Sequence, residues 1–153
     1  MITSIFLSHT YPDSPEQERN IALLRSWFVG RGVSCSCVGK AETSPLLKIR
    51  NAIAASDAVV AYAMVKPGFR TNCANSPWVH MEAAMAIQAC KPVAILMDQS
   101  LPKVGMFDSK VTGLLTLFLP PTFDKVVLLS IVDEQLSRFL IEPCSRIPLN
   151  CLG

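Results

Sequence analysis

The sequence is poor in charged and aromatic residues, and neither kind is concentrated in one place. Charged residues make up 17% of the 153 positions and aromatic residues 7%, and the formal net charge is only +2. The basic residues are scattered along the chain from Arg19 to Arg146. A nucleic-acid site or an anionic membrane partner requires a concentrated basic patch, so we expect neither as a partner.

Long hydrophobic runs and a leader peptide are also missing, although half of the residues are hydrophobic. The longest apolar stretches, such as Ala58 to Val65, fall short of the roughly 18 residues that a membrane span needs. The segment from Met1 to Ser8 has neither the basic region nor the cleavage site of a signal peptide. We therefore expect one globular domain with a cytoplasmic location.

The six cysteines include no Cys-x-x-Cys pair. Cys35 and Cys37 lie in an alternating apolar run, where a strand would direct both side chains to the same face. We interpret them as small core or surface residues rather than zinc ligands, and we expect no metal. In a cytoplasmic protein all six thiols are expected to be reduced.

Signatures of the common nucleotide-binding loops are missing as well. The sequence has no Gly-x-Gly-x-x-Gly before a helix and no Walker loop, and Gly30-Arg31-Gly32 follows a predicted helix, where it is a stop signal. The first predicted strand ends in Phe6-Leu7-Ser8-His9. That ending has neither the acidic residues of response regulators nor the glycine of a flavodoxin phosphate loop.

Short apolar runs alternate with helical patterns along the chain. Serine followed by proline occurs before each of the first three helical patterns, and this pair is typical of a helix start. The pattern predicts strands at 2–8, 33–38, 58–64, 92–97 and 114–119. It predicts helices from 15 to about 29, from 45 onward, from 77 to about 89 and from 123 to 140, with loops at 66–75 and 99–112. In the second of these helices Leu46, Ile49 and Ile53 lie three and four positions apart, which places them on one apolar side.

Strands separated by single helices require right-handed crossovers and a parallel sheet covered on both faces. The sequence therefore predicts an α/β domain with a flavodoxin-like, doubly wound, five-stranded parallel sheet in the order 2-1-3-4-5. We expect this domain to span 1–141 and an irregular tail to span 142–153. Ligands of such sheets bind at the carboxyl ends of the strands, near the switch point between strands one and three.

Glu82 is the most informative residue. The predicted third helix, from Pro77 to Ala89, carries this one carboxylate and no lysine or arginine. Its neighbours three and four positions away are apolar, so none can form an ion pair with it. A carboxylate in such surroundings is costly unless it has a use, although an exposed position on a narrow polar stripe is the alternative.

Several segments resemble a TIR (Toll/interleukin-1 receptor) domain. They are Ile5-Phe6-Leu7-Ser8-His9, Ala55-Ser56-Asp57-Ala58-Val59-Val60, Ser76-Pro77-Trp78-Val79-His80-Met81-Glu82 and Lys91-Pro92-Val93. The resemblance covers about residues 2 to 140. The Trp-x-x-x-Glu segment is its specific part and is similar to that of TIR domains that consume NAD.

The resemblance implies a catalytic glutamate at Glu82 and an NAD site around it. It places Ser8, His9 and Thr10 beside the ligand. Lys40 would meet a phosphate or be solvated. Trp78 would stack on nicotinamide or pack in the core, and its place at the start of an apolar helical stripe favours the core.

The resemblance also implies NAD as a substrate rather than a bound cofactor, and activity in defence or stress signalling. Related domains become active when they self-associate and complete one another's sites. A separate sensor domain or protein would supply the trigger.

One carboxylate suits this chemistry. Cleavage of a ribosyl C–N bond passes through an oxocarbenium-like transition state that a nearby anion stabilises. Nicotinamide in NAD is already cationic and leaves as a neutral molecule, so no acid has to protonate it. Hydrolysis and cyclisation to a cyclic ADP-ribose remain equally open.

Two other interpretations remain. Nucleoside deoxyribosyltransferases share the predicted fold, a strand like Ser56 to Ala61 and a Glu-x-x-x-Ala helix before Lys-Pro-Val. Asp57, the other carboxylate of these segments, would cap a strand or shape the pocket, and its place before strand three favours the edge of the sheet opposite the ligand. The second interpretation is a catalytically silent TIR scaffold.

Overall fold

The computed structural model describes residues 1–38, 45–66 and 77–143. Within these ranges the chain forms a five-stranded, all-parallel sheet in the order β2-β1-β3-β4-β5, which confirms the expected flavodoxin-like fold. The strands are β1 (Ser4–His9), β2 (Ser34–Ser36), β3 (Ala58–Ala63), β4 (Val93–Asp98) and β5 (Leu115–Leu119). The helices are α1 (Pro15–Val29), α2 (Pro45–Ala55), α3 (Pro77–Gln88), α4 (Ser109–Thr112) and α5 (Lys125–Ile141), with a 3₁₀ turn, η1 (Gly105–Phe107).

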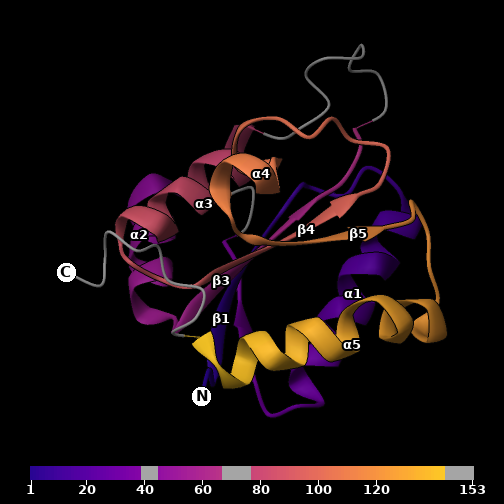
Figure 1. Cartoon of the computed structure of the whole chain (residues 1–153), viewed down its shortest axis with the longest axis horizontal. Coiled ribbons are helices and arrows are strands. Elements are labelled where there is room, and N and C mark those ends of the chain that lie inside the picture. Colours follow the sequence, from indigo (N-terminus) through magenta and orange to yellow (C-terminus); the bar gives the residue numbers. More distant parts are fainter. Residues whose placement is uncertain (39–44, 67–76, 144–153) are drawn as a thin grey trace.

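Helices cover both faces of the sheet (Figure 1). β3 and β4 are buried along their whole length, because their odd and even side chains face different helix layers. One core cluster joins the sheet to α1 and α5 and the other joins it to α2, α3 and η1. α1 connects β1 to β2, toward one edge of the sheet, whereas α2 and α3 lead to β3 and β4, toward the other edge. The two helix layers therefore separate at β1 and β3.

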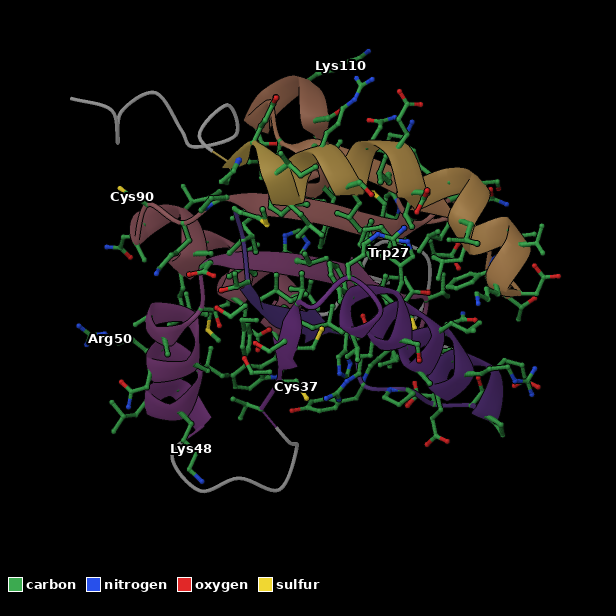
Figure 2. The ribbon with its side chains drawn as sticks, turned by 90° about the horizontal axis from the view of Figure 1, so that it is seen from below. Trp27, Cys37, Lys48, Arg50, Cys90 and Lys110 are labelled. Atoms are coloured by element: carbon green, nitrogen blue, oxygen red, sulfur yellow. The ribbon has the colours of Figure 1, made fainter. Side chains whose placement is uncertain are left out.

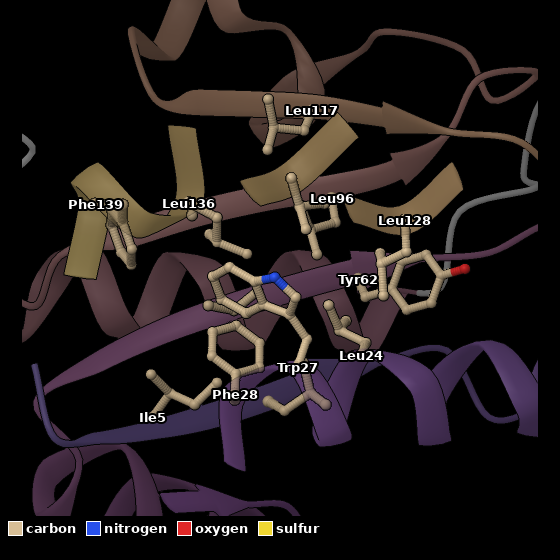
Figure 3. Packing of buried hydrophobic residues seen from close by; sticks show 14 of the residues in the cluster. Ile5, Leu24, Trp27, Phe28, Tyr62, Leu96, Leu117, Leu128, Leu136 and Phe139 are labelled. Carbon is tan, nitrogen blue, oxygen red and sulfur yellow. The ribbon is translucent and has the colours of Figure 1, made fainter. Parts of the chain in front are cut away.

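The larger aromatic side chains fill the α1–α5 side (Figure 3). Trp27 and Phe28 of α1 meet edge to face with ring centroids 5.0 Å apart, and Leu136 and Phe139 of α5 lie in the same cluster. The indole nitrogen of Trp27 donates to Asp133 at 3.2 Å, which gives this buried ring a polar partner on α5. These contacts hold α1 against α5, away from the α3 layer.

The first helix start is confirmed in detail. The Ser14 side chain accepts a hydrogen bond from the Gln17 amide, and Pro15 occupies the first helical turn. The side-chain amide of Gln17 donates a hydrogen bond to the Val65 carbonyl at 2.7 Å, which ties α1 to the segment after β3. Ser44 and Ser76, the other two expected caps, lie outside the described residues.

Two local predictions are wrong. The expected loop at 99–112 contains η1 and α4, because Asp108 caps a single helical turn that ends at Gly113 in the left-handed region. Leu46, expected on the buried side of α2 with Ile49 and Ile53, is 53% exposed, and only the two isoleucines enter the core.

The cysteines also differ from expectation. Cys90 is disulfide-bonded, so the prediction of reduced thiols is wrong for this residue. Cys90 directly follows α3, and Figure 2 shows it at the edge of the molecule. Cys35 and Cys37 are free thiols, and β2 ends before Cys37. A disulfide is unusual in a reducing compartment, so the cytoplasmic location stays a prediction.

Two polar residues of the segments that resemble a TIR domain, Asp57 and Lys91, stabilise the edge of the sheet where the strands begin. One Asp57 carboxylate oxygen accepts from the amides of Thr3 and Ser4 at 2.8 and 2.9 Å, and these bonds lower the Asp57 pKa to about 2. The Lys91 ammonium donates to the carbonyls of Ala54 and Ser56, at the end of α2. Asp57 therefore lies at the edge opposite the expected ligand site.

Within residues 1–38, 45–66 and 77–143, no helix is both long enough and apolar enough to cross a bilayer.

Candidate active site

A small pocket lies where β1, the segment after β2 and the first two turns of α3 meet. Its volume is about 10 Å³, which is roughly the space of one water molecule. The pocket is at the carboxyl end of β1, next to the point where the two helix layers separate. Among the described residues, it is lined by Phe6, Leu7, His9, Tyr11, Cys37, Val38, Trp78 and Glu82.

Glu82 is the carboxylate of this pocket, and it is buried. Its side chain is 9% exposed, on a helix whose Val79, Ala83 and Ala86 are fully buried against the sheet. Burial raises the Glu82 pKa above its usual value, while Ser8 and His9 act in the opposite direction. The alternative of an exposed glutamate on a polar stripe is therefore wrong.

Ser8 lies beneath Glu82 and is 1% exposed. Phe6 and Ser8 are two positions apart on β1, so both face the α3 layer, where Phe6 belongs to the core cluster of α3. The Ser8 hydroxyl is close enough to lower the pKa of Glu82. Its geometry nevertheless falls outside that of a hydrogen bond, and in the described part of the chain Ser8 Oγ has no partner.

His9 is held in one orientation by its own backbone. Its Nδ1 lies 2.9 Å from the carbonyl oxygen of Thr10, which can only accept, so Nδ1 carries the proton. A neutral His9 therefore presents Nε2 as an acceptor toward its surroundings. The ring lies edge to face with Tyr11, at 6.4 Å between centroids.

Thr10 is near the pocket but has a different task. It is fully buried, and its hydroxyl accepts from the Met64 amide at 3.0 Å while its own amide donates to Tyr62. These bonds continue the pairing of β1 with β3 beyond the strands. The acceptor capacity of the Thr10 hydroxyl is thus used on the backbone, and Thr10 shapes the rim of the site.

Trp78 begins α3 at the mouth of the pocket. Its side chain is 44% exposed, so the interpretation of Trp78 as a core residue is wrong. An aromatic ring that is half exposed at a pocket mouth is available to stack on a planar ligand. Lys40, which would contact a phosphate or be solvated, lies outside the described residues.

Tyr11 and Cys37 line the same pocket, and sequence reasoning did not select either of them. Burial and the charge of Glu82 raise the pKa of the Tyr11 phenol, which keeps it protonated at neutral pH. Cys37, labelled in Figure 2, is an exposed thiol. The Arg25 guanidinium donates a hydrogen bond to its sulfur at 3.6 Å. The available signal was position alone, since in the structure Tyr11 lies two residues after β1 and Cys37 directly follows β2.

Other titratable groups near this edge face elsewhere. Asp98 is the last residue of β4, and its carboxylate accepts hydrogen bonds from the backbone amide and the hydroxyl of Ser100. The charge of Asp98 helps to raise the pKa of Tyr62, which belongs to the α1–α5 cluster. His80 packs on Phe107 with ring centroids 4.2 Å apart. Among the described residues, Glu82 is therefore the one carboxylate that lines the pocket.

This arrangement is suited to charge stabilisation. The described part of the chain holds no group of three or more histidine, cysteine, aspartate or glutamate residues that could bind a metal ion. What converges instead is a buried carboxyl, a hydroxyl without a partner, an imidazole nitrogen and an exposed indole. Together they offer an anion in a dry setting, hydrogen bonds for a hydroxylated ligand and a surface for a planar ring.

No protein-family model and no curated protein matches the sequence. Solved structures do resemble the fold. One is the CMP N-glycosidase BcmB of Clostridium botulinum, which is 16% identical with a TM-score of 0.59 over 90% of this chain and 99% of that chain.

Two further matches are weaker. A deoxyribosyltransferase from Leishmania mexicana is 19% identical, with a TM-score of 0.48 over 73% of this chain and 72% of that chain. The TIR domains of the activated Roq1 resistosome, which directly recognises the pathogen effector XopQ, are 16% identical, with a TM-score of 0.47 over 72% and 69%. Only the likeness to the CMP N-glycosidase is strong enough to establish a shared fold, and the TIR resemblance of the sequence stays a prediction.

Replacing Glu82 with glutamine is expected to stabilise the protein at neutral pH. The native pKa of Glu82 is raised above the usual 4.5, so ionising this carboxyl costs more in the folded than in the unfolded state. That cost is absent below about pH 4 and complete above the native pKa. At pH 7 we expect the melting temperature of Glu82→Gln to rise by about 2–4 °C, the shift for about 1 kcal/mol in a chain of this size.

Thermal melts of both proteins at pH 4 and pH 7 measure this effect. Glu134→Gln is the matched control, because Glu134 is 75% exposed on α5. Its replacement should shift the melting temperature by much less. A Glu82→Gln protein that melts below wild type at pH 7 would show that the ionised carboxylate stabilises the fold.

Proposed function

We propose that this domain cleaves the N-ribosidic bond of NAD and releases nicotinamide, with Glu82 as the catalytic carboxylate. The observation that carries the proposal is the position of Glu82. It is a buried carboxyl in an apolar helix, at the carboxyl end of β1, and it faces a pocket lined by hydrogen-bonding and aromatic side chains. A protein tolerates a buried carboxylate without an ion-pair partner where the group has a chemical task.

The choice of NAD follows from the number of acidic groups. The described pocket has one carboxylate, and an ionised Glu82 can stabilise the oxocarbenium-like transition state at the ribose. The same group cannot then also protonate a leaving base. Nicotinamide needs no proton to leave, because its ring is cationic in NAD and becomes neutral on departure. A single carboxylate is therefore sufficient for this substrate.

The neighbouring residues would orient the ligand. His9, the last residue of β1, and Tyr11, two residues later, line the same pocket, and His9 Nε2 and the Tyr11 phenol would bind hydroxyl groups of the ligand. Trp78 at the mouth of the pocket would stack on the planar nicotinamide ring. The ribosyl carbon would react either with water or with a nitrogen of the same substrate, which corresponds to hydrolysis or cyclisation.

A nucleoside 5′-monophosphate is the second candidate substrate. The CMP N-glycosidase shares the fold of this chain over 90% of this chain and 99% of that chain, which supports a related substrate. Cytosine is a poor leaving group and would need protonation. The raised pKa of Glu82 favours a protonated carboxyl, which could supply that proton.

We also propose that the site is completed by self-association. A dinucleotide pocket usually has a volume of about 300–1,000 Å³. The pocket beside Glu82 has about 10 Å³, so NAD needs either a rearrangement or additional walls. A second copy of the domain, brought together by a separate sensor in a defence or stress response, would supply such walls.

The first functional prediction concerns Glu82. Replacing it with glutamine or alanine should lower nicotinamide release from NAD at least about 100-fold, because the anion that stabilises the transition state is removed. Chromatography of NAD, nicotinamide and ADP-ribose measures the rate. Glu134→Gln should retain the wild-type rate. A Glu82→Gln protein as active as wild type would overturn the catalytic assignment.

The second prediction concerns the substrate. NAD, and NADP with it, should be cleaved, whereas free deoxynucleosides should not, because their bases leave only after protonation. Parallel incubations with NAD, CMP and deoxyadenosine plus a second purine identify the released or exchanged base. Cytosine release from CMP without nicotinamide release would select the second candidate. Base exchange that is lost in Glu82→Ala would instead indicate a deoxyribosyltransferase.

The third prediction concerns assembly. If a neighbouring copy completes each site, the rate per molecule should rise steeply with protein concentration and with crowding agents. Initial rates over a hundredfold range of concentration, with light scattering on the same samples, provide the measurement. A rate per molecule that is constant across this range would contradict assembly, and a complete lack of turnover at every concentration would indicate a silent scaffold.

A further inference from the structure

A groove runs between α1 and α5, the two helices that cover the face of the sheet opposite α3 (Figure 1). It consists of two cavities with volumes of about 380 and 540 Å³. Leu23 of α1 and Lys125 of α5 line both cavities, so the two are neighbours along the same pair of helices. The groove shares none of its described lining residues with the pocket beside Glu82, so it is a separate site.

The floor of this α1–α5 groove is apolar. Trp27 and Leu128 line it and belong to the core that α1 shares with α5, as Figure 3 shows. Leu23 and Leu129 pack against the same core and remain partly exposed. Cavities of about 300–1,000 Å³ with a mostly apolar lining are typical of binding sites. The groove therefore offers apolar surface that no described segment of the chain covers.

The rim of the groove is positively charged. Three cations, Arg19, Arg31 and Lys125, line it together with one carboxylate, Asp124, which leaves an excess of two positive charges. The Asp124 side chain is used within the fold, because it caps α5 by accepting from the Val127 amide at 2.9 Å. A partner with negative charge is therefore complementary to this rim.

Two of the three cations have no task within the fold. Arg31 lies 3.7 Å from the centre of the Trp27 ring and pairs with Asp133. Among the residues that the structure describes, the side chains of Arg19 and Lys125 form neither an ion pair nor a hydrogen bond. Lys125 is also the first residue of α5, where the helix dipole disfavours a cation. An anion from outside the chain would give both cations a partner.

The length of the groove distinguishes between kinds of partner. Its lining residues on the α1 side recur from Arg19 through Leu23 and Trp27 to Gly30, at spacings of three and four. Eleven residues of helix rise about 17 Å, which is three helical turns. A compact small molecule would occupy one of the two cavities. A helix of three or four turns would occupy both, with its apolar stripe on the floor of the groove.

We propose that the α1–α5 groove binds an acidic amphipathic helix of a partner protein. The apolar side chains of this helix lie on Leu23, Trp27 and Leu129, and its carboxylates face Arg19 and Lys125. Because the groove is on the face opposite α3, the partner leaves the Glu82 pocket uncovered. The inference is therefore independent of the proposed function.

Peptide selection against the full chain tests this inference. Random peptides of about 16 residues, long enough for four helical turns, are displayed on phage and selected on the immobilised protein. Enriched peptides should have a net negative charge and apolar residues at helical spacing. The most enriched peptide is then synthesised with a fluorescein label, and anisotropy titrations measure its Kd for the wild-type protein and for each variant.

Lys125→Glu and Ser26→Trp are the test variants. Lys125→Glu places a like charge against the peptide and should weaken binding at least about 10-fold. A glutamate suits the first turn of α5, so this variant should melt no lower than wild type. Ser26 is exposed at the smaller cavity, so Ser26→Trp should fill that cavity and weaken binding by a similar factor. Lys110→Glu is the matched control, because it makes the same charge change on α4, outside the groove, and should bind like wild type.

Several outcomes would overturn the inference. They are the absence of any enriched peptide, enrichment of neutral or basic peptides, and acidic peptides that bind both test variants as tightly as wild type. Sedimentation velocity examines a second copy of this chain as the occupant. Self-association that both test variants lose, without binding of an acidic peptide, would assign the groove to that copy and overturn the acidic partner.

Nicotinamide release separates this inference from the proposed function. Wild type, Lys125→Glu and Ser26→Trp should release nicotinamide at equal rates under the same conditions, because the groove and the Glu82 pocket share no described residue. Peptide binding that depends on the groove, without nicotinamide release by any of the three proteins, would support the docking site and reject NAD cleavage. Nicotinamide release without such binding would do the reverse.

Discussion

The burial of β3 and β4 on both faces is the constraint on which the rest of the structure depends. A parallel sheet with two apolar faces must be covered by helices on both sides, and right-handed crossovers determine which helix goes to which side. α1 and α5 therefore cover one face and α2 and α3 the other, so the layers separate at the carboxyl ends of β1 and β3. The candidate site lies beside this separation, between the carboxyl end of β1 and the first two turns of α3.

The site combines polar groups that the fold does not satisfy internally. Asp57 and Lys91, at the opposite edge of the sheet, have several partners each and serve to hold elements together. Glu82 is instead buried with a raised pKa, and Ser8 has a buried hydroxyl without a partner in the described chain. Polar side chains thus stabilise the edge of the sheet where the strands begin, whereas at the other edge they lower the free energy of unfolding. Such a division is what a stability–function trade-off predicts.

Much of this could be predicted from sequence patterns, and the errors have identifiable causes. The alternation of apolar runs and helical spacing was sufficient for strand number, order and direction, because a sheet buried on both faces leaves few alternative topologies. The turn of α4 was missed because Asp108 and Gly113 define an element too short for periodicity to reveal. Trp78 was assigned to the core because spacing along a helix does not reveal where the covering layer ends. Tyr11 was missed because its segment has no periodic pattern, and Cys37 was missed because the alternation does not show that β2 ends before it, at the pocket.

The sequence by itself determined the fold class and singled out Glu82, since local periodicity and the lack of a charged neighbour on its helix are properties of nearby residues. Only the tertiary structure decided that Glu82 is buried, that Ser8 lies beneath it without a hydrogen-bond partner in the described chain, and that Thr10 is committed to the backbone of β3. These facts depend on residues more than fifty positions apart along the chain. Their proximity follows from strand register and from how closely α3 packs on β1, and the packing of distant segments is not encoded in any local pattern.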